Sequence, residues 1–369
     1  MDLWGRTFSR RQLEGYVGDM RQIADIRLAT LDDGPERGVR VADIRTGSGL
    51  DFTVLLDRGL DIGTASYNGI AVAWQSGSGP AHPARHEPEG AGWLRTFHGG
   101  LLTLCGMSHV GPGMIDPENG ETLGLHGRVS HIPAHDVRIE RLWTADDQWR
   151  LRLHGVIDEA SIFGSKLHLE RSIEITPGEP VITLQDTVRN SGGEAAPLMM
   201  LYHCNFGWPL VSPESELISP AQSISARDAA AEAGISEWNK MSEPTPAYAE
   251  QVFYHTLAPD SDTSTSQSAA LLNRPLGLGM EVRFDSATLT QLTEWKQMGY
   301  GDYVLGIEPG NCVPEGRVAA RANHRLTMLA PGETKTFTLG FRMLTSRREV
   351  DAFRENSKHR LLHGVGDDS

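Results

Sequence analysis

The chain has 369 residues, a formal net charge of -14 and 39% hydrophobic residues, which is enough apolar material for a large core. No apolar run approaches the roughly 18 residues that span a bilayer, and the N-terminus lacks the apolar stretch of a signal peptide. The acidic balance disfavours nucleic acid, which needs a basic surface. We therefore expect a cytoplasmic protein without membrane or nucleic-acid partners, and a homodimer as the assembly to test.

The three cysteines, Cys105, Cys204 and Cys312, are widely separated and form no CxxC or CxxxC pair. This spacing disfavours a zinc ribbon and a disulfide framework, so we expect all three to be reduced.

The predicted elements begin with a short helix, because Ser9 and Gln12 form a capping-box pattern. From Leu50 onwards the dominant pattern is alternation of apolar and polar residues, as in "LDFTVLL". Similar runs recur at 136–143, 149–157, 166–175, 180–188, 278–284 and 334–344. Turn residues separate them, which predicts a β-sandwich or barrel.

Two segments depart from this pattern. Residues 211–250 are rich in Pro, Ser, Glu and Ala and show no strand pattern, so we expect a long excursion with a helical turn near Ala226–Ala233. Such a segment is either a lid or a tolerated insertion. Ser346 and Glu349 predict a C-terminal helix to about Leu361, followed by a frayed tail. We expect one domain over 1–346 and a helix with tail over 347–369.

The first candidate site lies in "YVLGIEPGNC", residues 303–312. Alternation places Val304, Gly306 and Glu308 on one face of a strand. Gly306 leaves a gap beside the Glu308 carboxylate, which is room for a ligand. The alternative is a structural pair between Glu308 and an arginine at the end of the strand.

The second candidate lies in "PLMMLYHCNFGWPL", residues 197–210. One face of this strand is apolar, whereas the other ends in His203, Asn205 and Gly207. Cys204 points away from His203, which disfavours a Cys/His nucleophile pair. This change from apolar to polar residues on one face favours a pocket edge over a structural histidine.

Further polar residues stand in glycine-rich segments. "LGLHGRVSHIPAH" carries His126, Arg128, His131 and His135, but it contains no HExxH or HxH pair, so we expect no metal. Arg58 follows a strand, where a guanidinium suits ligand oxygens or a structural Asp partner. Trp295 and Lys296 are adjacent, and a tryptophan offers either a sugar-stacking face or core packing. We find no nucleotide-binding loop and expect no cofactor.

The ordered set "DRGLDIG", "FHGGLLTLCG", "LHGR", "LYHCNFGWPL" and "GIEPGNC" resembles the aldose 1-epimerase, or galactose mutarotase-like, superfamily. It is most similar to an uncharacterised bacterial branch of that superfamily. The resemblance covers roughly residues 20–345, and it implies a large antiparallel β-supersandwich with short helices at the termini.

The resemblance also implies roles for individual residues. The family's catalytic acid and base correspond to His203 and Glu308. A histidine and an arginine that bind the sugar correspond to His126 and Arg58. The chain departs from the family at Asn273, where mutarotases carry an aspartate. It also has His98 where hexose-6-phosphate epimerase relatives carry an arginine.

These observations predict a carbohydrate mutarotase or epimerase, with a carbohydrate as its small-molecule partner. The alternatives are a non-catalytic sugar-binding or sensing protein and a metal-dependent isomerase. The substrate-binding residues that we expect are Arg58, His98, His126, Arg128, Asn205, Asn273, Trp295 and Lys296. We also expect at least one of the cations Arg58, Arg128, Lys296 and Arg317 to contact an anionic group on the sugar. Arg58 and Arg128 are the preferred candidates.

Overall fold

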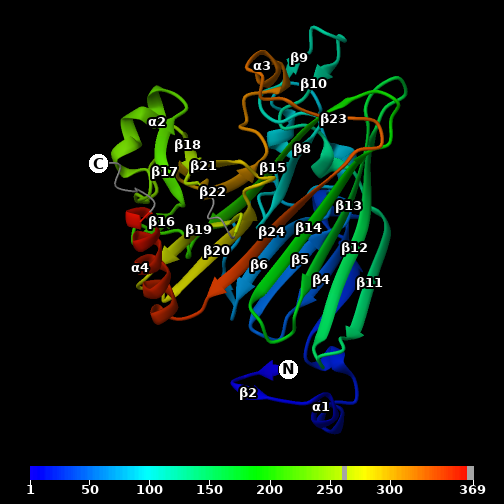
Figure 1. Cartoon of the computed structure of the whole chain (residues 1–369), viewed down its shortest axis with the longest axis vertical. Helices are drawn as coiled ribbons and strands as arrows, with labels where there is room; N and C mark the ends of the chain where they lie inside the picture. Colours follow the sequence, from blue (N-terminus) through cyan, green and yellow to red (C-terminus); the bar gives the residue numbers. More distant parts are fainter. Residues whose placement is uncertain (260–263, 364–369) are drawn as a thin grey trace.

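The computed structural model describes residues 1–259 and 264–363, and most of its regular structure is β-strand. Within these residues, antiparallel strand pairing builds three large sheets (Figure 1), which we call the N-terminal sheet, the long sheet and the site sheet. The predicted all-β class and antiparallel architecture are confirmed.

The N-terminal sheet has the order β3-β4-β5-β6-β7, so each strand pairs with its neighbour in sequence. Alternation explains the central strand, where Leu50, Phe52 and Val54 are buried and Asp51 is exposed. Its strands are β3 (Asp25–Thr30), β4 (Arg40–Arg45), β5 (Leu50–Leu55), β6 (Asp61–Tyr67) and β7 (Ile70–Ala71).

The long sheet has the order β11-β12-β13-β14-β24-β20-β19-β16. Strand β24, the last of the described strands, lies inside this sheet and pairs with β14 on one side and β20 on the other. It therefore connects the two parts of the sheet. Its strands are β11 (His135–Trp143), β12 (Trp149–Ala160), β13 (Lys166–Ile175), β14 (Val181–Asn190), β24 (Thr334–Leu344), β20 (Leu278–Asp285), β19 (Ser266–Asn273) and β16 (Ser215–Ile218). The predicted alternating runs from 136 onwards are confirmed as β11 to β14, β20 and β24.

The site sheet has the order β17-β18-β21-β22-β15-β23, and β8 also pairs with β15. Every residue of β15 is buried, because both faces of this strand are covered. Its strands are β17 (Ala221–Ala226), β18 (Gln251–Leu257), β21 (Gln291–Met298), β22 (Tyr303–Gly310), β15 (Ala196–Gly207), β23 (Thr327–Leu329) and β8 (Thr103–Met107).

Short elements complete the described part of the chain. Two small hairpins are β1 (Asp2–Leu3) with β2 (Arg6–Thr7) and β9 (Met114–Ile115) with β10 (Thr122–Leu123). The α-helices are α1 (Arg10–Tyr16), α2 (Ala229–Gly234), α3 (Arg317–Ala322) and α4 (Arg347–His363). Single 3-10 turns lie at 20–22, 34–36, 83–85, 92–95, 129–131 and 235–237. None of the helices in the described residues has the length and apolar character that crossing a membrane requires.

Both predicted helix starts are confirmed. The Ser9 hydroxyl accepts from the Gln12 backbone N–H, and the Gln12 side chain accepts from the Ser9 N–H, which is a complete capping box. The Glu349 backbone N–H donates to the Ser346 hydroxyl at the start of α4. The tail predicted to fray includes residues 364–369, which lie outside the described residues.

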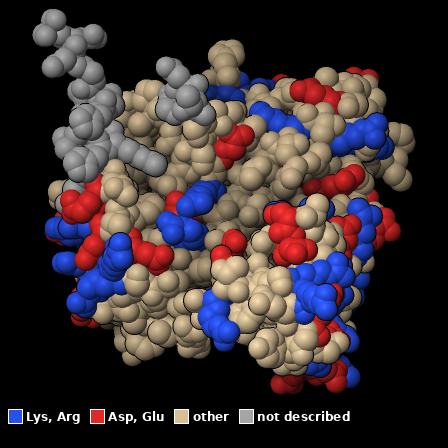
Figure 2. Space-filling view, turned by 60° about the horizontal axis from the view of Figure 1, so that its bottom comes forward, with Lys and Arg blue, Asp and Glu red and all other residues tan. Residues whose placement is uncertain are grey.

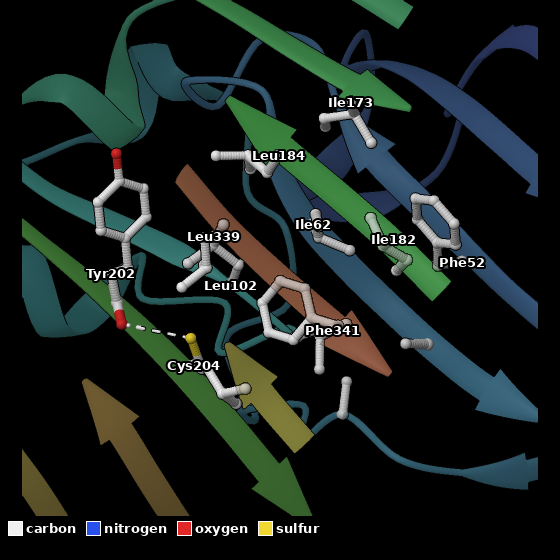
Figure 3. Close-up of a cluster of buried hydrophobic side chains, with 14 of the residues drawn as sticks. Phe52, Ile62, Leu102, Ile173, Ile182, Leu184, Tyr202, Cys204, Leu339 and Phe341 are labelled. Carbon is white, nitrogen blue, oxygen red and sulfur yellow. Dashed lines mark hydrogen bonds between the residues drawn. The ribbon is translucent and has the colours of Figure 1, made fainter. Parts of the chain in front are cut away.

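The sheets share one hydrophobic core (Figure 3). Phe52 and Ile62 come from the N-terminal sheet, Ile182 and Phe341 from the long sheet, and Cys204 from the site sheet. The Cys204 thiol donates to the Tyr202 carbonyl, 3.3 Å away, so it points into this core as predicted. All three cysteines are buried and outside any disulfide.

The prediction of a strandless excursion at 211–250 is wrong. The segment contains β16, which joins the long sheet, and β17, which joins the site sheet. The predicted helical turn is present as α2. Two further contacts fix the segment: the Tyr303 hydroxyl donates to the Ser242 carbonyl, and the Lys296 ammonium donates to the Glu237 carbonyl.

The surface carries charges of both signs. On the face shown in Figure 2, Lys and Arg side chains are interspersed with Asp and Glu side chains. Exposed ion pairs of the chain include Arg21–Asp19 and Arg10–Glu14.

Candidate active site

Two neighbouring strands of the site sheet bring His203 and Glu308 together. The cross-strand pair Cys204–Ile307 places the preceding residue of β15, His203, opposite the following residue of β22, Glu308. Directly opposite residues on one face have Cβ atoms about 4.5–5.5 Å apart. The register therefore turns two residues that are distant in sequence into neighbours.

His203 and Glu308 are in contact in the structure. His203 Nε2 lies 3.0 Å from Glu308 Oε1, and the two side chains are only 7% and 4% exposed. The atoms are close but not aligned for a hydrogen bond. A Cβ added at Gly306 would stand 2.8 Å from Glu308 Oε1, so glycine provides the space that this carboxyl group occupies. The space that Gly306 leaves is filled by the Glu308 carboxyl group, Trp295 Cβ and His203 Cε1, so room for a ligand stays a prediction. Strand β22 continues to Gly310 instead of ending at Glu308.

Burial shifts both groups toward their neutral forms. It lowers the pKa of His203 to about 4, although the Asn205 side chain opposes this shift. Burial, followed by the nearby charge of Glu250, raises the pKa of Glu308 well above its ordinary value. Both shifts favour the uncharged forms, which are the neutral imidazole and the protonated carboxyl group.

His126 stands beside this pair and comes from the loop after β10. Its backbone has a φ of 55°, its N–H donates to the Gly111 carbonyl, and its carbonyl accepts from the Gly106 N–H. A Cβ at Gly127 would lie 2.4 Å from the Gly106 carbonyl oxygen, so this close approach requires glycine. The His126 ring centroid is 6.3 Å from that of His203. Burial lowers the His126 pKa to about 3, and its Nδ1 makes no hydrogen bond to the described chain.

Aromatic rings form a wall around the His203 imidazole. Phe97 and Trp295 contact it at centroid distances of 5.3 Å and 5.2 Å. Trp93 stacks on Phe97 at 4.5 Å, and Trp74 meets the edge of Trp295 at 6.1 Å. These rings are close-packed and apolar on their faces, which suits the carbon face of a small polar ligand.

A charged pair, Arg227 and Glu250, lies beside Trp295 and holds its indole ring. The Trp295 indole N–H donates to Glu250 Oε2 at 2.9 Å, and Arg227 contacts Glu250 Oε1 at 2.9 Å. Arg227 also pairs with Asp228 at 2.7 Å. Glu250 directly precedes β18 and Arg227 directly follows β17. These two strands pair antiparallel, so both residues lie at the same end of the pair.

Two predicted substrate-binding residues support the site from behind. The Asn205 amide donates to the carbonyls of Gly99 and Gly100 and is fully buried, so its donors hold the neighbouring loop. His98 is buried against Asp61 and Thr103, at 3.4 Å and 3.3 Å.

Four predicted ligand contacts are instead parts of the framework. The buried Arg58 guanidinium donates to the carbonyls of Ser130, Ala81 and Thr96, and these bonds occupy its donors. Lys296 faces away from Trp295 on β21, and Arg317 pairs with Asp116. The Asn273 amide donates to the Pro209 and Leu210 carbonyls and to two serine hydroxyls.

Arg128 is exposed, and the groups that its charge affects are His86 and Glu159.

The histidines of the 123–135 segment do not form one cluster. His126 lies at the site, His131 contacts Arg58 and Thr96, and the exposed His135 contacts Asp158. In residues 1–259 and 264–363, no group of three or more His, Cys, Asp or Glu side chains is arranged to hold a metal ion.

A separate polar groove of about 440 Å³ lies on the long sheet. Its lining includes Arg138, Arg152, His154 and Glu170 from β11, β12 and β13. These strands do not carry His203 or Glu308. The groove has its own imidazole and carboxylate neighbours, because His154 Nε2 lies 3.7 Å from Glu170 Oε2, but the Glu170 side chain is 53% exposed, whereas both His203 and Glu308 are buried.

Several residues of the site escaped prediction from the sequence. They are Trp74, Trp93, Phe97, Arg227, Glu250, Tyr254 and Thr293. Thr293 pairs directly with Glu308 across β21 and β22, and Tyr254 pairs with Thr293 across β18 and β21. No sequence pattern singled out these residues, and the register that sets Thr293 and Tyr254 in line with Glu308 cannot be read from one strand.

Comparison with protein families gives one match. A family model described as a domain of unknown function, DUF4432, matches residues 36–343. No curated protein matches the chain.

Solved structures share the fold. A candidate aldose 1-epimerase from Klebsiella pneumoniae is 25% identical with a TM-score of 0.84, and the match covers 93% of this chain and 88% of that one. A galactose mutarotase-like protein from Clostridium acetobutylicum is 14% identical, with a TM-score of 0.60 and coverage of 87% and 99%. A galactose 1-epimerase from Lactobacillus acidophilus is 12% identical, with a TM-score of 0.55 and coverage of 87% and 98%. The predicted galactose mutarotase-like fold is confirmed.

Proposed function

The chain belongs to the DUF4432 family, and we propose that it is a carbohydrate mutarotase or related epimerase. It would interconvert the anomers or epimers of an aldose or sugar derivative by acid–base catalysis at His203 and Glu308. The observation that carries the proposal is the buried 3.0 Å contact between an imidazole and a carboxyl group, opposite each other on one sheet. The fold shared with the Klebsiella pneumoniae protein supports it.

Opening of a cyclic hemiacetal requires two proton transfers. Glu308 acts as the base that takes the proton from the anomeric hydroxyl, and His203 acts as the acid that protonates the ring oxygen. Rotation about the C1–C2 bond then exposes the other face of the aldehyde. Ring closure reverses both transfers, because neutral His203 recovers its proton from the hydroxyl and Glu308 returns one to the carbonyl oxygen. The protein therefore ends each cycle unchanged.

The buried pair holds the one proton that this cycle needs. Burial favours placing that proton on Glu308, since it raises the Glu308 pKa and lowers the His203 pKa. Moving it to His203 gives the imidazolium and carboxylate that ring opening requires, with the same total charge. The separation of 3.0 Å brings Oε1 and Nε2 close enough for this transfer once the two side chains turn into hydrogen-bond alignment.

Neighbouring side chains supply binding and orientation. Neutral His126 offers one donor and one acceptor to sugar hydroxyls, and its Nδ1 has no hydrogen-bond partner in the described chain. The faces of Trp295 and Phe97 suit the C–H surface of a pyranose or furanose ring. We expect these contacts to contribute to binding, while His203 and Glu308 carry the chemistry.

A non-catalytic sugar-binding or sensing protein is the second candidate. The low exposure of His203 and Glu308, 6% and 3%, favours it, because a catalytic pair must reach its substrate. An enzyme of this design requires local opening around the aromatic wall.

An exchange experiment separates the two candidates. Proton NMR exchange spectroscopy is run on aldoses, their phosphates and acidic sugars with and without the protein, alongside calorimetric binding. Faster anomer exchange with at least one sugar supports the enzyme. Binding without faster exchange supports the second candidate, and neither response with any sugar contradicts both.

Cytoplasmic location, a homodimer and the absence of nucleic-acid or membrane partners stay predictions of the sequence. Light scattering on the purified chain tests the assembly.

A further inference from the structure

Thr293 occupies a place in the site for which the fold alone gives no reason. It lies on β21, its cross-strand partner is Glu308, and its side chain is therefore on the same face. The residue is 1% exposed, and its Oγ1 makes no hydrogen bond to the described chain. A buried hydroxyl without a partner is costly, and threonine could be replaced there by isosteric valine.

The register extends this position into a row. Tyr254, Thr293, Glu308 and His203 lie opposite one another on β18, β21, β22 and β15. Neighbouring strands are about 4.8 Å apart, so a hydroxyl one carbon away from the group at Glu308 falls within reach of Thr293. The unpartnered Thr293 hydroxyl is both a donor and an acceptor for such a group.

The charges around this row disfavour an anionic ligand. Glu250 and Glu294 both raise the Glu308 pKa, and Arg227 is the cation that opposes them. Arg227 is itself paired with Asp228 and Glu250. Two carboxylates already balance the Arg227 charge, so a phosphate or carboxylate bound here would meet net negative charge.

The other expected cations are also committed elsewhere. Arg58 and Lys296 donate to backbone carbonyls, and Arg317 pairs with Asp116. The charge of Arg128 acts on His86 and Glu159 instead of on the catalytic pair. The expectation of an anionic substrate therefore loses its support at these positions.

We propose that the row takes a neutral aldose and that Thr293 binds the hydroxyl on the carbon next to the anomeric centre. This inference rests on the proposed function, and it adds the substrate class and one residue that determines specificity. Thr293 orients the sugar so that the anomeric hydroxyl meets Glu308, while Tyr254 lies further along the row.

The test compares Thr293→Val with Thr293→Ser in the full-length protein. Substrates are D-glucose, D-galactose and D-ribose, each with its 2-deoxy counterpart and its terminal phosphate ester, and anomer exchange gives kcat/KM. We expect wild type to prefer a neutral aldose over its phosphate. Thr293→Val should lower kcat/KM about tenfold for the parent sugar and by less than about threefold for the 2-deoxy sugar. Thr293→Ser should stay within about threefold of wild type on both.

A matched control is Thr256→Val, at an exposed threonine of the neighbouring strand β18. Circular dichroism and the urea midpoint verify folding of every variant. If Thr293→Val does not fold, the test is the comparison of parent and 2-deoxy sugars as substrates of the wild type. Equal losses on both sugars, equal wild-type use of both, or a preference for the phosphates would overturn the inference while leaving the mutarotase intact. Lack of exchange with every sugar would instead remove the proposed function itself.

Discussion

At the scale of single residues, the protonation of His203 and Glu308 sets an expected pH profile. The reaction needs one proton on the pair, so activity should fall when the pair gains a second proton on His203, whose pKa is about 4. It should also fall when the pair loses its proton on the alkaline side, above the ordinary range of a carboxyl group, because burial raises the Glu308 pKa. We expect a plateau between these limits.

The measurement is kcat/KM for anomer exchange as a function of pH, with circular dichroism at each pH as the control for folding. The two pKa values that limit activity in this profile belong to the His203–Glu308 pair as a coupled system. An acid limb near 6.5, the ordinary pKa of histidine, would contradict the buried neutral imidazole.

The same scale shows what one sequence can and cannot predict. Side chains alternate between the two faces of a strand. This alternation alone predicted that His203 lies on a face that ends in polar residues and that Gly306 lies beside Glu308. The role of Arg58 was not predictable in this way. Its acceptor carbonyls belong to residues that are 23 to 72 positions away, and nothing in the sequence near Arg58 identifies them.

At the scale of elements, the end of the 211–250 segment controls the site through Glu250. Glu250→Ala removes the acceptor of the Trp295 indole and a charge that raises the Glu308 pKa. We therefore expect the alkaline limb of the pH profile to move to lower pH and KM to rise severalfold. Glu243→Ala, at an exposed position of the same segment, is the control and should leave both unchanged. An unmoved alkaline limb in Glu250→Ala would remove Glu250 from the electrostatics of the site.

This segment also marks the limit of strand prediction. β16 and β17 are short and lie at the edges of two different sheets, and β17 has no fully buried residue. Edge strands with one lightly packed face lack the strong alternation that revealed β13 and β24. Their partners, β19 and β18, supply the register that their own residues do not specify.

At the scale of the whole molecule, a buried ion pair within the long sheet is joined to the site sheet by a hydrogen bond. Asp186 on β14 contacts the Arg171 guanidinium at 2.6 Å and accepts from the Tyr202 hydroxyl of β15 at 2.7 Å. Asp186→Ala leaves the charge of fully buried Arg171 without this partner. We expect a loss of about 3–5 kcal/mol in the free energy of unfolding, measured by urea denaturation.

The matched control is Glu14→Ala, which breaks the exposed Arg10–Glu14 pair and should cost no more than about 0.5 kcal/mol. Similar small losses in both variants would mean that Asp186, through its contacts with Arg171 and Tyr202, does not stabilise the fold. Overall architecture was predictable from the sequence because many alternating runs and turns imply stacked antiparallel sheets. Contacts between sheets, such as Asp186 with Tyr202, depend on a tertiary arrangement that no single run encodes.

The central claim is that His203 and Glu308 interconvert anomers, and anomer exchange in Glu308→Gln tests it most directly. The matched control is Glu294→Gln, because Glu294 is similarly buried in the same sheet but contacts His255 on the opposite face. Its charge also raises the Glu308 pKa, so both variants are compared on the pH plateau, where a shift of that pKa leaves the rate unchanged. With a sugar that the wild type turns over, we expect Glu308→Gln to lower the exchange rate by about 10²–10⁴-fold, the range for loss of a general base, and Glu294→Gln to stay near the wild-type rate. Exchange by folded Glu308→Gln at the wild-type rate would contradict the account.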